Sequence, residues 1–225
     1  MSDGLKVLIT GVTGMVGEGV LHECTLHPGI SSILVLTRKP TGIDHPKIKE
    51  IVHQDFFNLF PIREQFRDID ACFFCLGISS VGIPAEQYYR TTYTLTMHVA
   101  TVLLQSSPQS IFCYVSGAGT DSSEKGRIRW ARIKGQTENH LMKLPFKAVY
   151  AFRPGFMKPT PGLNNTKTIY KYINWFYPIG RRFFPGKYCT LRELGLAMIN
   201  TAIRGYDKKI IEGADIIALA TDPHK

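Results

Sequence analysis

The chain has 225 residues, of which 44% are hydrophobic and 20% charged, a composition typical of one globular domain with a sizeable core. Its formal net charge of +9 favours anionic partners such as phosphates, nucleic acid or an acidic membrane surface. The lysines and arginines are dispersed without a nucleic-acid-binding motif, and no apolar run reaches the roughly 18–20 residues of a membrane span, which argues against a nucleic-acid-binding or membrane-spanning protein.

The first 153 residues alternate short apolar runs with helical stretches. The predicted strands are Leu5–Thr10, Ile33–Thr37, Ile48–Val52, Ala71–Leu76, Ser110–Val115 and Lys147–Phe152, and the predicted helices are Met15–Leu26, Ala85–Gln105 and Arg127–Lys143. Near-continuous apolar strands are typical of a parallel sheet buried on both faces, and alternation with helices indicates βαβ crossovers. The sequence therefore predicts an α/β protein with a doubly wound parallel sheet of the Rossmann type.

A glycine-rich loop follows the first predicted strand and opens the first helix. Its sequence is Gly11-Val12-Thr13-Gly14-Met15-Val16-Gly17. Glycines there allow a tight turn, a close approach of a ligand to the backbone, and close packing of helix on strand. The helix N-terminus supplies free N–H groups and the positive end of a dipole. The loop therefore predicts a seat for the pyrophosphate of a dinucleotide.

The end of the second predicted strand bears on which dinucleotide binds. A carboxylate there suits the ribose 2′-hydroxyl of NAD, whereas a cation suits the 2′-phosphate of NADP. This chain has Thr37-Arg38-Lys39 and no acidic residue before Asp44, which favours NADP over NAD. Alternatively, Arg38 and Lys39 are a solvated charge pair that leaves the sheet edge.

The five cysteines are an odd number in a chain large enough to fold without disulfides, so we expect reduced thiols. They are Cys24, Cys72, Cys75, Cys113 and Cys189. Cys72 and Cys75 lie three apart in a predicted strand, where they would point to opposite faces, so we expect no metal site. The N-terminus lacks the charged start and apolar stretch of a secretory signal peptide. Together these features predict a cytoplasmic protein.

The character of the sequence changes after Phe152. We expect a loop to about Asn165, a helix over Thr166–Tyr177, a loop over Pro178–Lys187, and a helix over Leu191–Arg204 that begins with a capping box of Thr190 and Glu193. This tail is too short for an independent domain. We expect one NAD(P)-binding domain over residues 1–225, with a cofactor-binding core at 1–155 and a substrate-side lobe at 156–225.

The stretch Ile169–Phe184 interleaves aromatic with basic residues. Such a mixture suits a membrane surface or an interface with a second copy or another protein. A wall of the substrate pocket and ordinary core are commoner uses of aromatic residues, so these alternatives stay open.

Several motifs in chain order carry a family resemblance. They are the Gly-x-x-Gly-x-x-Gly loop, Gln54-Asp55, Cys75-Leu76-Gly77, Val115-Ser116-Gly117-Ala118, Lys134 followed by Gly135 and Glu138, and Arg153-Pro154-Gly155. Over Leu5–Gly155 the chain resembles the atypical and extended short-chain dehydrogenase/reductases, in particular NmrA-like and Tat-interacting-protein-like NAD(P)-binding proteins, often labelled sugar-nucleotide epimerases.

The resemblance implies roles for particular residues. Ser116 would hold the substrate oxygen, and Lys134 would bind the nicotinamide ribose and lower the pKa of a catalytic tyrosine. Together with the loop and strand arguments, the expected cofactor-binding residues are Gly11, Thr13, Gly14, Met15, Val16, Gly17, Thr37, Arg38, Lys39, Asp55, Phe56, Cys75, Leu76, Gly77, Lys134, Arg153, Pro154 and Gly155. Each of Ser116 and Lys134 also has a plainer interpretation, as a turn cap and a surface lysine.

The expected catalytic tyrosine, one helical turn before Lys134, is replaced by Trp130. A phenol with pKa near 10 can give and take a proton, whereas an indole N–H donates a hydrogen bond but does not titrate. The sequence therefore predicts an NADP-dependent oxidoreductase or epimerase-like protein that acts on an unidentified carbonyl or alcohol with altered acid catalysis. The alternative is a non-catalytic, NADP-sensing regulatory or scaffold protein.

Overall fold

The main sheet has seven parallel strands in the order β3-β2-β1-β4-β5-β6-β9. The structure is a computed structural model that describes residues 4–163, 165 and 177–221. The strands are β1 (Leu5–Thr10), β2 (Ile30–Thr37), β3 (Ile48–Val52), β4 (Ala71–Phe74), β5 (Ile111–Val115), β6 (Ala148–Arg153) and β9 (Ile210–Glu212). The order steps outward from β1 in both directions, as in a doubly wound sheet, and this confirms the predicted Rossmann architecture.

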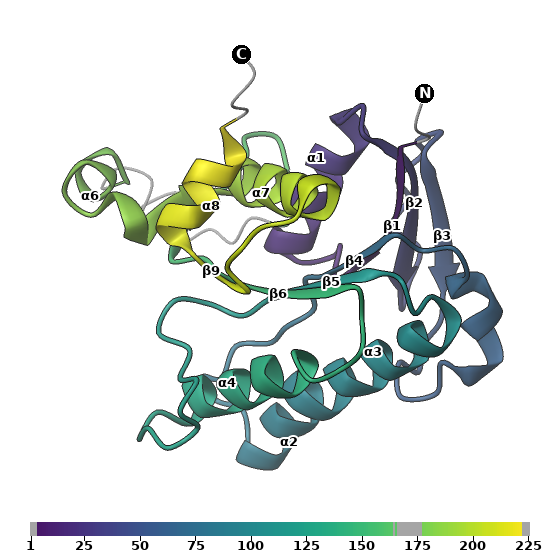
Figure 1. The fold of residues 1–225 in the computed structure, drawn as a ribbon, viewed down its shortest axis with the longest axis horizontal. Coiled ribbons are helices and arrows are strands. Elements are labelled where there is room, and N and C mark those ends of the chain that lie inside the picture. The colour runs from purple at the N-terminus through teal and green to yellow at the C-terminus, as the bar shows by residue number, and fades with distance from the viewer. Residues whose placement is uncertain (1–3, 164, 166–176, 222–225) are drawn as a thin grey trace.

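Helices cover both faces of this sheet (Figure 1). One face carries α1 (Met15–Leu26), α7 (Leu191–Arg204) and α8 (Gly213–Ala220), and the other carries α2 (Ala85–Tyr89), α3 (Leu95–Ser106) and α4 (Arg129–Leu141). The single helix predicted over Ala85–Gln105 is broken into α2 and α3 by a π-helical turn at Arg90–Thr94. A π-turn preserves helical periodicity approximately, so a hydrophobic pattern does not reveal it.

Each face of the sheet has its own hydrophobic core. Val7 and Ile9 belong to the core beneath α1 and α7, whereas Leu8, between them, belongs to the core beneath α3. Phe73 and Phe74 divide in the same way. Successive side chains on a strand alternate between faces, so a strand buried on both sides must be apolar throughout. This is why the continuous apolar runs predicted the strands.

The Cys-x-x-Cys pair lies at β4 and the residue that follows it. Cys72 is buried in the core on the α3 side, and Cys75 packs against the core on the α1 side, so the two sulfurs lie on opposite faces as expected. Burial raises the pKa of both thiols, which keeps them protonated. In the described part of the chain, no helix is long and apolar enough to cross a membrane, and no group of His, Cys, Asp and Glu is placed to hold a metal ion.

The capping box at the start of α7 is confirmed. The Glu193 N–H donates to Thr190 Oγ1 at 3.0 Å, and the Thr190 N–H donates to Glu193 Oε2 at 2.7 Å. Three strands escaped prediction because they are short: β9, and the strands β7 (Phe156–Lys158) and β8 (Tyr188–Thr190), which form a two-stranded parallel sheet. Helix α8, of eight residues, was also not predicted.

The loop predicted over Pro178–Lys187 is wrong. The structure has helix α6 (Tyr177–Phe183) and a 3₁₀ turn at Pro185–Lys187. A tertiary contact explains the difference: Arg181 binds Glu193 through two hydrogen bonds of 2.8 and 2.6 Å, which fastens α6 to the first turn of α7. The helix predicted over Thr166–Tyr177 lies outside the described residues except for Tyr177, as does the first half of the stretch Ile169–Phe184.

Candidate functional site

The glycine-rich loop between β1 and α1 is shaped by two close approaches. Gly11 has a φ of +75°, and a Cβ there would lie 2.7 Å from the carbonyl of Cys75. A Cβ on Gly17 would lie 2.2 Å from the carbonyl oxygen of Gly11, so α1 packs on the loop too tightly for any side chain. Both glycines are therefore needed by the fold itself.

Gly14 differs from these two glycines. It is exposed and has extended backbone angles, and the only atom near a Cβ built there is the Gly11 carbonyl oxygen at 3.4 Å, an ordinary contact. The space above it is open at the N-terminus of α1, where N–H groups lack intrahelical acceptors. Among its neighbours Thr13 is exposed, and Met15 and Val16 are half-buried. The loop thus fits a pyrophosphate, which needs close access to the backbone.

Arg38 and Lys39 follow β2 and are exposed, with neither engaged in an ion pair among the described residues. Thr37 is buried, and its hydroxyl donates to the Lys39 carbonyl at 2.9 Å, which holds the turn. On neighbouring β3 the Glu50 carboxylate accepts hydrogen bonds from the N–H and hydroxyl of Thr41. This edge of the sheet therefore offers two free cations.

The residues predicted after β3 and β4 lie at the same edge, because these strands are parallel to β1. Asp55 is exposed and its Oδ1 accepts from the Phe57 N–H at 2.9 Å, while Phe56 is buried. Leu76 is half-buried and Gly77 exposed. Carboxyl ends of parallel strands form the ligand-binding edge of open α/β sheets.

Ser116, Trp130 and Lys134 come together at the carboxyl end of β5. The Lys134 ammonium donates to the Ser116 carbonyl. The Trp130 ring packs on the loop after β5, with a ring carbon 3.6 Å from the position a Cβ on Gly119 would take. The spacing of four residues places Trp130 and Lys134 on one face of α4.

The Ser116 hydroxyl is directed inward. It donates to Glu138 Oε1 at 2.5 Å, and the Phe152 carbonyl oxygen lies 3.2 Å away. Ser116 is buried, so its side chain is satisfied within the protein. The contact of Ser116 with Lys134 is made by the backbone carbonyl of Ser116, which accepts a hydrogen bond from the Lys134 ammonium.

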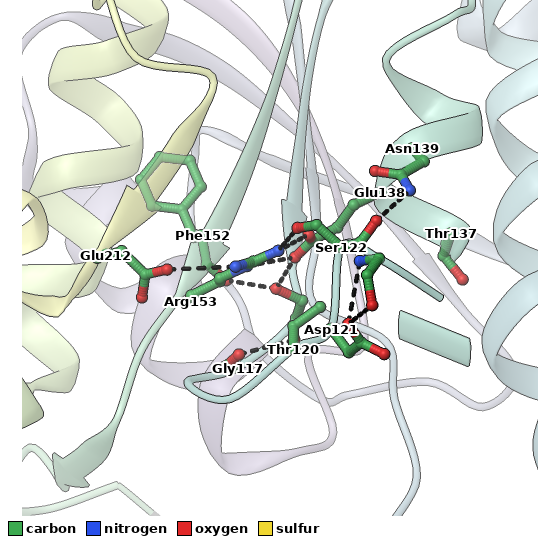
Figure 2. Close-up of polar contacts among 12 residues, drawn as sticks. Gly117, Thr120, Asp121, Ser122, Thr137, Glu138, Asn139, Phe152, Arg153 and Glu212 are labelled. Carbon is green, nitrogen blue, oxygen red and sulfur yellow. Dashed lines mark hydrogen bonds and ion pairs between the residues drawn. The ribbon is translucent and has the colours of Figure 1, made fainter. Parts of the chain in front are cut away.

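Arg153 and Glu138 form a buried ion pair with two hydrogen bonds, Nε to Oε1 at 3.1 Å and Nη2 to Oε2 at 2.5 Å. Figure 2 shows the guanidinium between Glu138 and Ser122 on one side and Glu212 on the other. Arg153, predicted at the cofactor, is thus held by internal partners. The sequence motif contained Glu138 but assigned it no role, because its partner lies on β6.

Pro154 and Gly155, also predicted at the cofactor, join the loop after β5 to the C-terminal segment. The Pro154 carbonyl accepts from the Ala118 N–H at 2.9 Å. A Cβ on Gly155 would lie 2.3 Å from the Lys187 carbonyl oxygen, so the backbone passes close to the 3₁₀ turn. These residues connect β5, β6 and the lobe at the ligand edge.

Burial lowers the pKa of Lys134 from 10.5 to about 8, because desolvation disfavours the ammonium more than the Glu138 carboxylate favours it. Glu138 is 1% exposed, and its oxygens are already used by Arg153 and Ser116. Lys134 itself retains some exposed surface. The site therefore holds a lysine whose pKa, at about 8, is lower than that of an ordinary lysine.

A cavity of about 490 Å³ opens elsewhere, between the end of β7, the start of α7 and the end of α8. Its lining includes Lys158, Thr160, Arg192 and Glu193, and none of the predicted site residues. Glu193 is committed to the cap of α7 and to Arg181, so we place the candidate chemistry at β5 and α4 instead.

Comparison with known proteins gives a family and a fold that agree with this geometry. A profile of the NAD dependent epimerase/dehydratase family matches residues 7–126, more than half of the chain. ADP-L-glycero-D-manno-heptose-6-epimerase of Helicobacter pylori has a similar fold, with a TM-score of 0.66 and 14% identity over 97% of this chain and 82% of that one.

The chain spans very different shares of the lengths of two curated relatives. The hybrid PKS-NRPS synthetase poxE of Penicillium oxalicum is 28% identical over 52% of this chain, which spans 3% of that protein. The mitochondrial protein FMP52 of Eremothecium gossypii is 21% identical over 96% of this chain and 97% of its own length.

The predicted cytoplasmic location is wrong on this comparison, since FMP52 proteins of several fungi are named as mitochondrial. The cysteine pattern on which that expectation was based does not distinguish one reducing compartment from another.

Proposed function

The chain belongs to the NAD-dependent epimerase/dehydratase family, which confirms its resemblance to the extended short-chain dehydrogenase/reductases, and from this premise we propose that it is an NADP-dependent oxidoreductase of carbonyl or alcohol substrates. The observation that carries the proposal is the open Gly14 position at the N-terminus of α1, together with Arg38 and Lys39 at the end of β2, two cations without an ion-pair partner among the described residues. A phosphate-rich dinucleotide complements both features.

The proposed roles follow from where the residues lie. The loop Gly11–Gly17 would hold the pyrophosphate, and Arg38 and Lys39 the 2′-phosphate. When bound, the cofactor supplies or accepts a hydride. Lys134 and the backbone of Ser116 lie at the end of β5, where a substrate carbonyl would be oriented. Trp130 would form an apolar wall there and donate at most one hydrogen bond.

We expect NADPH to bind at least about tenfold more tightly than NADH, because one charge-assisted contact contributes roughly 1.5–3 kcal/mol. Arg38→Ala should reduce that preference while leaving NADH affinity unchanged. Fluorescence titration with NADPH and with NADH measures the ratio of the two affinities. The matched control is Arg67→Ala, at an exposed arginine bound to Glu64. Equal affinities in the wild type, or an unchanged ratio in Arg38→Ala, would contradict the NADP assignment.

A second candidate function is a non-catalytic protein that senses NADP and binds another protein. The inward-facing Ser116 hydroxyl and the non-titrating Trp130 favour it, because neither offers an acidic proton to a substrate. In that case the nucleotide would bind normally and no carbonyl would be reduced.

A further inference from the structure

We infer that Lys134 itself gives the proton to the substrate oxygen, the task for which Trp130 is unsuited. The inference rests on the proposed oxidoreductase function and names the acid that this function needs. It assigns Lys134 a chemical role beyond binding a cofactor ribose.

The position of the ammonium supports this role. Lys134 Nζ reaches the carbonyl of Ser116, the first residue after β5, and so lies at the carboxyl edge of the sheet, where open α/β folds bind their ligands. One N–H is used by that carbonyl, and an ammonium has two more. Lys134 is half-buried as a residue, and in the proposed complex these hydrogens face the substrate oxygen.

The charged groups around Lys134 are bound to other partners and do not hold its ammonium in an ion pair. Glu138, one turn further along α4, would be its ordinary ion-pair partner, but both carboxylate oxygens bind Arg153 from β6. Glu212 from β9 lies on the far side of Arg153 and binds it at 3.3 Å. The phenol of Tyr114 on β5 is buried, and burial raises its pKa, so it stays neutral.

A lysine in this setting has the acidity that the reaction requires. With a pKa lowered by burial to about 8, the ammonium is mostly charged at neutral pH and is a much better acid than an ordinary lysine. Once the carbonyl carbon has accepted a hydride, the electron pair of the C–O double bond resides on oxygen. That oxygen takes a proton from Nζ as the N–H bond breaks, and the neutral amine regains a proton from water.

The experiment compares Lys134→Arg with the wild type and with Lys143→Arg, at an exposed lysine just beyond α4. An arginine keeps the positive charge but does not give up its proton. Reduction of reactive diketones and quinones by NADPH is followed across the pH range on either side of about 8. The pKa of Lys134 is measured independently by NMR on ¹³C-methylated lysines, with the Lys134→Arg protein to assign the signal.

We expect the wild-type rate to fall as pH rises through about 8, because the acid must be protonated. Lys134→Arg should bind NADPH yet lose about 10²–10⁴ in rate, and Lys143→Arg should keep the wild-type profile. Adding Trp130→Tyr to Lys134→Arg should restore part of the rate, since a phenol supplies a new proton donor one turn away.

Several results would overturn the inference. An active Lys134→Arg protein, a rate that stays constant above pH 8, or an NMR pKa at the ordinary lysine value would show that another group gives the proton, and the oxidoreductase function would still stand. A wild type that binds NADPH but reduces no carbonyl would overturn both the inference and the function, in favour of the sensor.

Discussion

Glu138→Ala is expected to lower the free energy of unfolding by about 3–5 kcal/mol, because it removes the buried carboxylate that makes two hydrogen bonds to Arg153 and leaves only the more exposed Glu212 carboxylate beside the guanidinium. Both partners of the pair are at most 8% exposed, so water cannot replace the lost hydrogen bonds. The same change removes the shorter hydrogen bond of the Ser116 hydroxyl, which keeps only the contact with the Phe152 carbonyl at 3.2 Å. Urea denaturation at neutral pH measures the loss.

The matched control is Glu64→Ala, which removes a carboxylate that binds Arg63 and Arg67 on the surface. Because Glu64 is 56% exposed, its pairs should contribute less than about 1 kcal/mol. The double variant Glu138→Leu/Arg153→Met, which replaces the pair by apolar side chains, should be more stable than Glu138→Ala alone. Equal losses from Glu138→Ala and Glu64→Ala would show that the buried pair is not a structural anchor.

Gly14→Val is expected to abolish measurable NADPH binding while leaving the fold nearly intact. The valine fits the extended backbone of Gly14 and meets only the Gly11 carbonyl oxygen at 3.4 Å from its Cβ. It would fill the space proposed for the pyrophosphate. Losing two charge-assisted hydrogen bonds of roughly 1.5–3 kcal/mol each would weaken binding by about 10²–10⁴.

Gly17→Val is the informative contrast, because its Cβ would lie 2.2 Å from the Gly11 carbonyl oxygen. That variant should lose thermal stability, whereas Gly14→Val should melt close to the wild type. Nucleotide titration and thermal unfolding of both proteins separate the two effects. Normal NADPH affinity in a folded Gly14→Val protein would mean that the loop is only a turn between β1 and α1.

The sequence by itself determined the Rossmann architecture, because the signals for it are local. Strands buried on both faces must be largely apolar, so Leu5–Thr10 was predicted to the residue. The edge strand Ile48–Val52, only partly buried, was predicted with the same bounds. The capping box of Thr190 and Glu193 is likewise a contact between residues three apart. The glycines of the first loop show in the sequence because a close approach excludes every side chain.

Only the tertiary structure decided what the polar residues at the end of β5 contact. Ser116 and Arg153 were predicted to face ligands, but both bind Glu138, which is separated from them by 22 and 15 residues. Helix α6 depends in the same way on the contact of Arg181 with Glu193. The sequence does not show which distant residue such a polar side chain will bind. The folded chain selects that partner by bringing distant elements together, and burial then makes the choice energetically decisive.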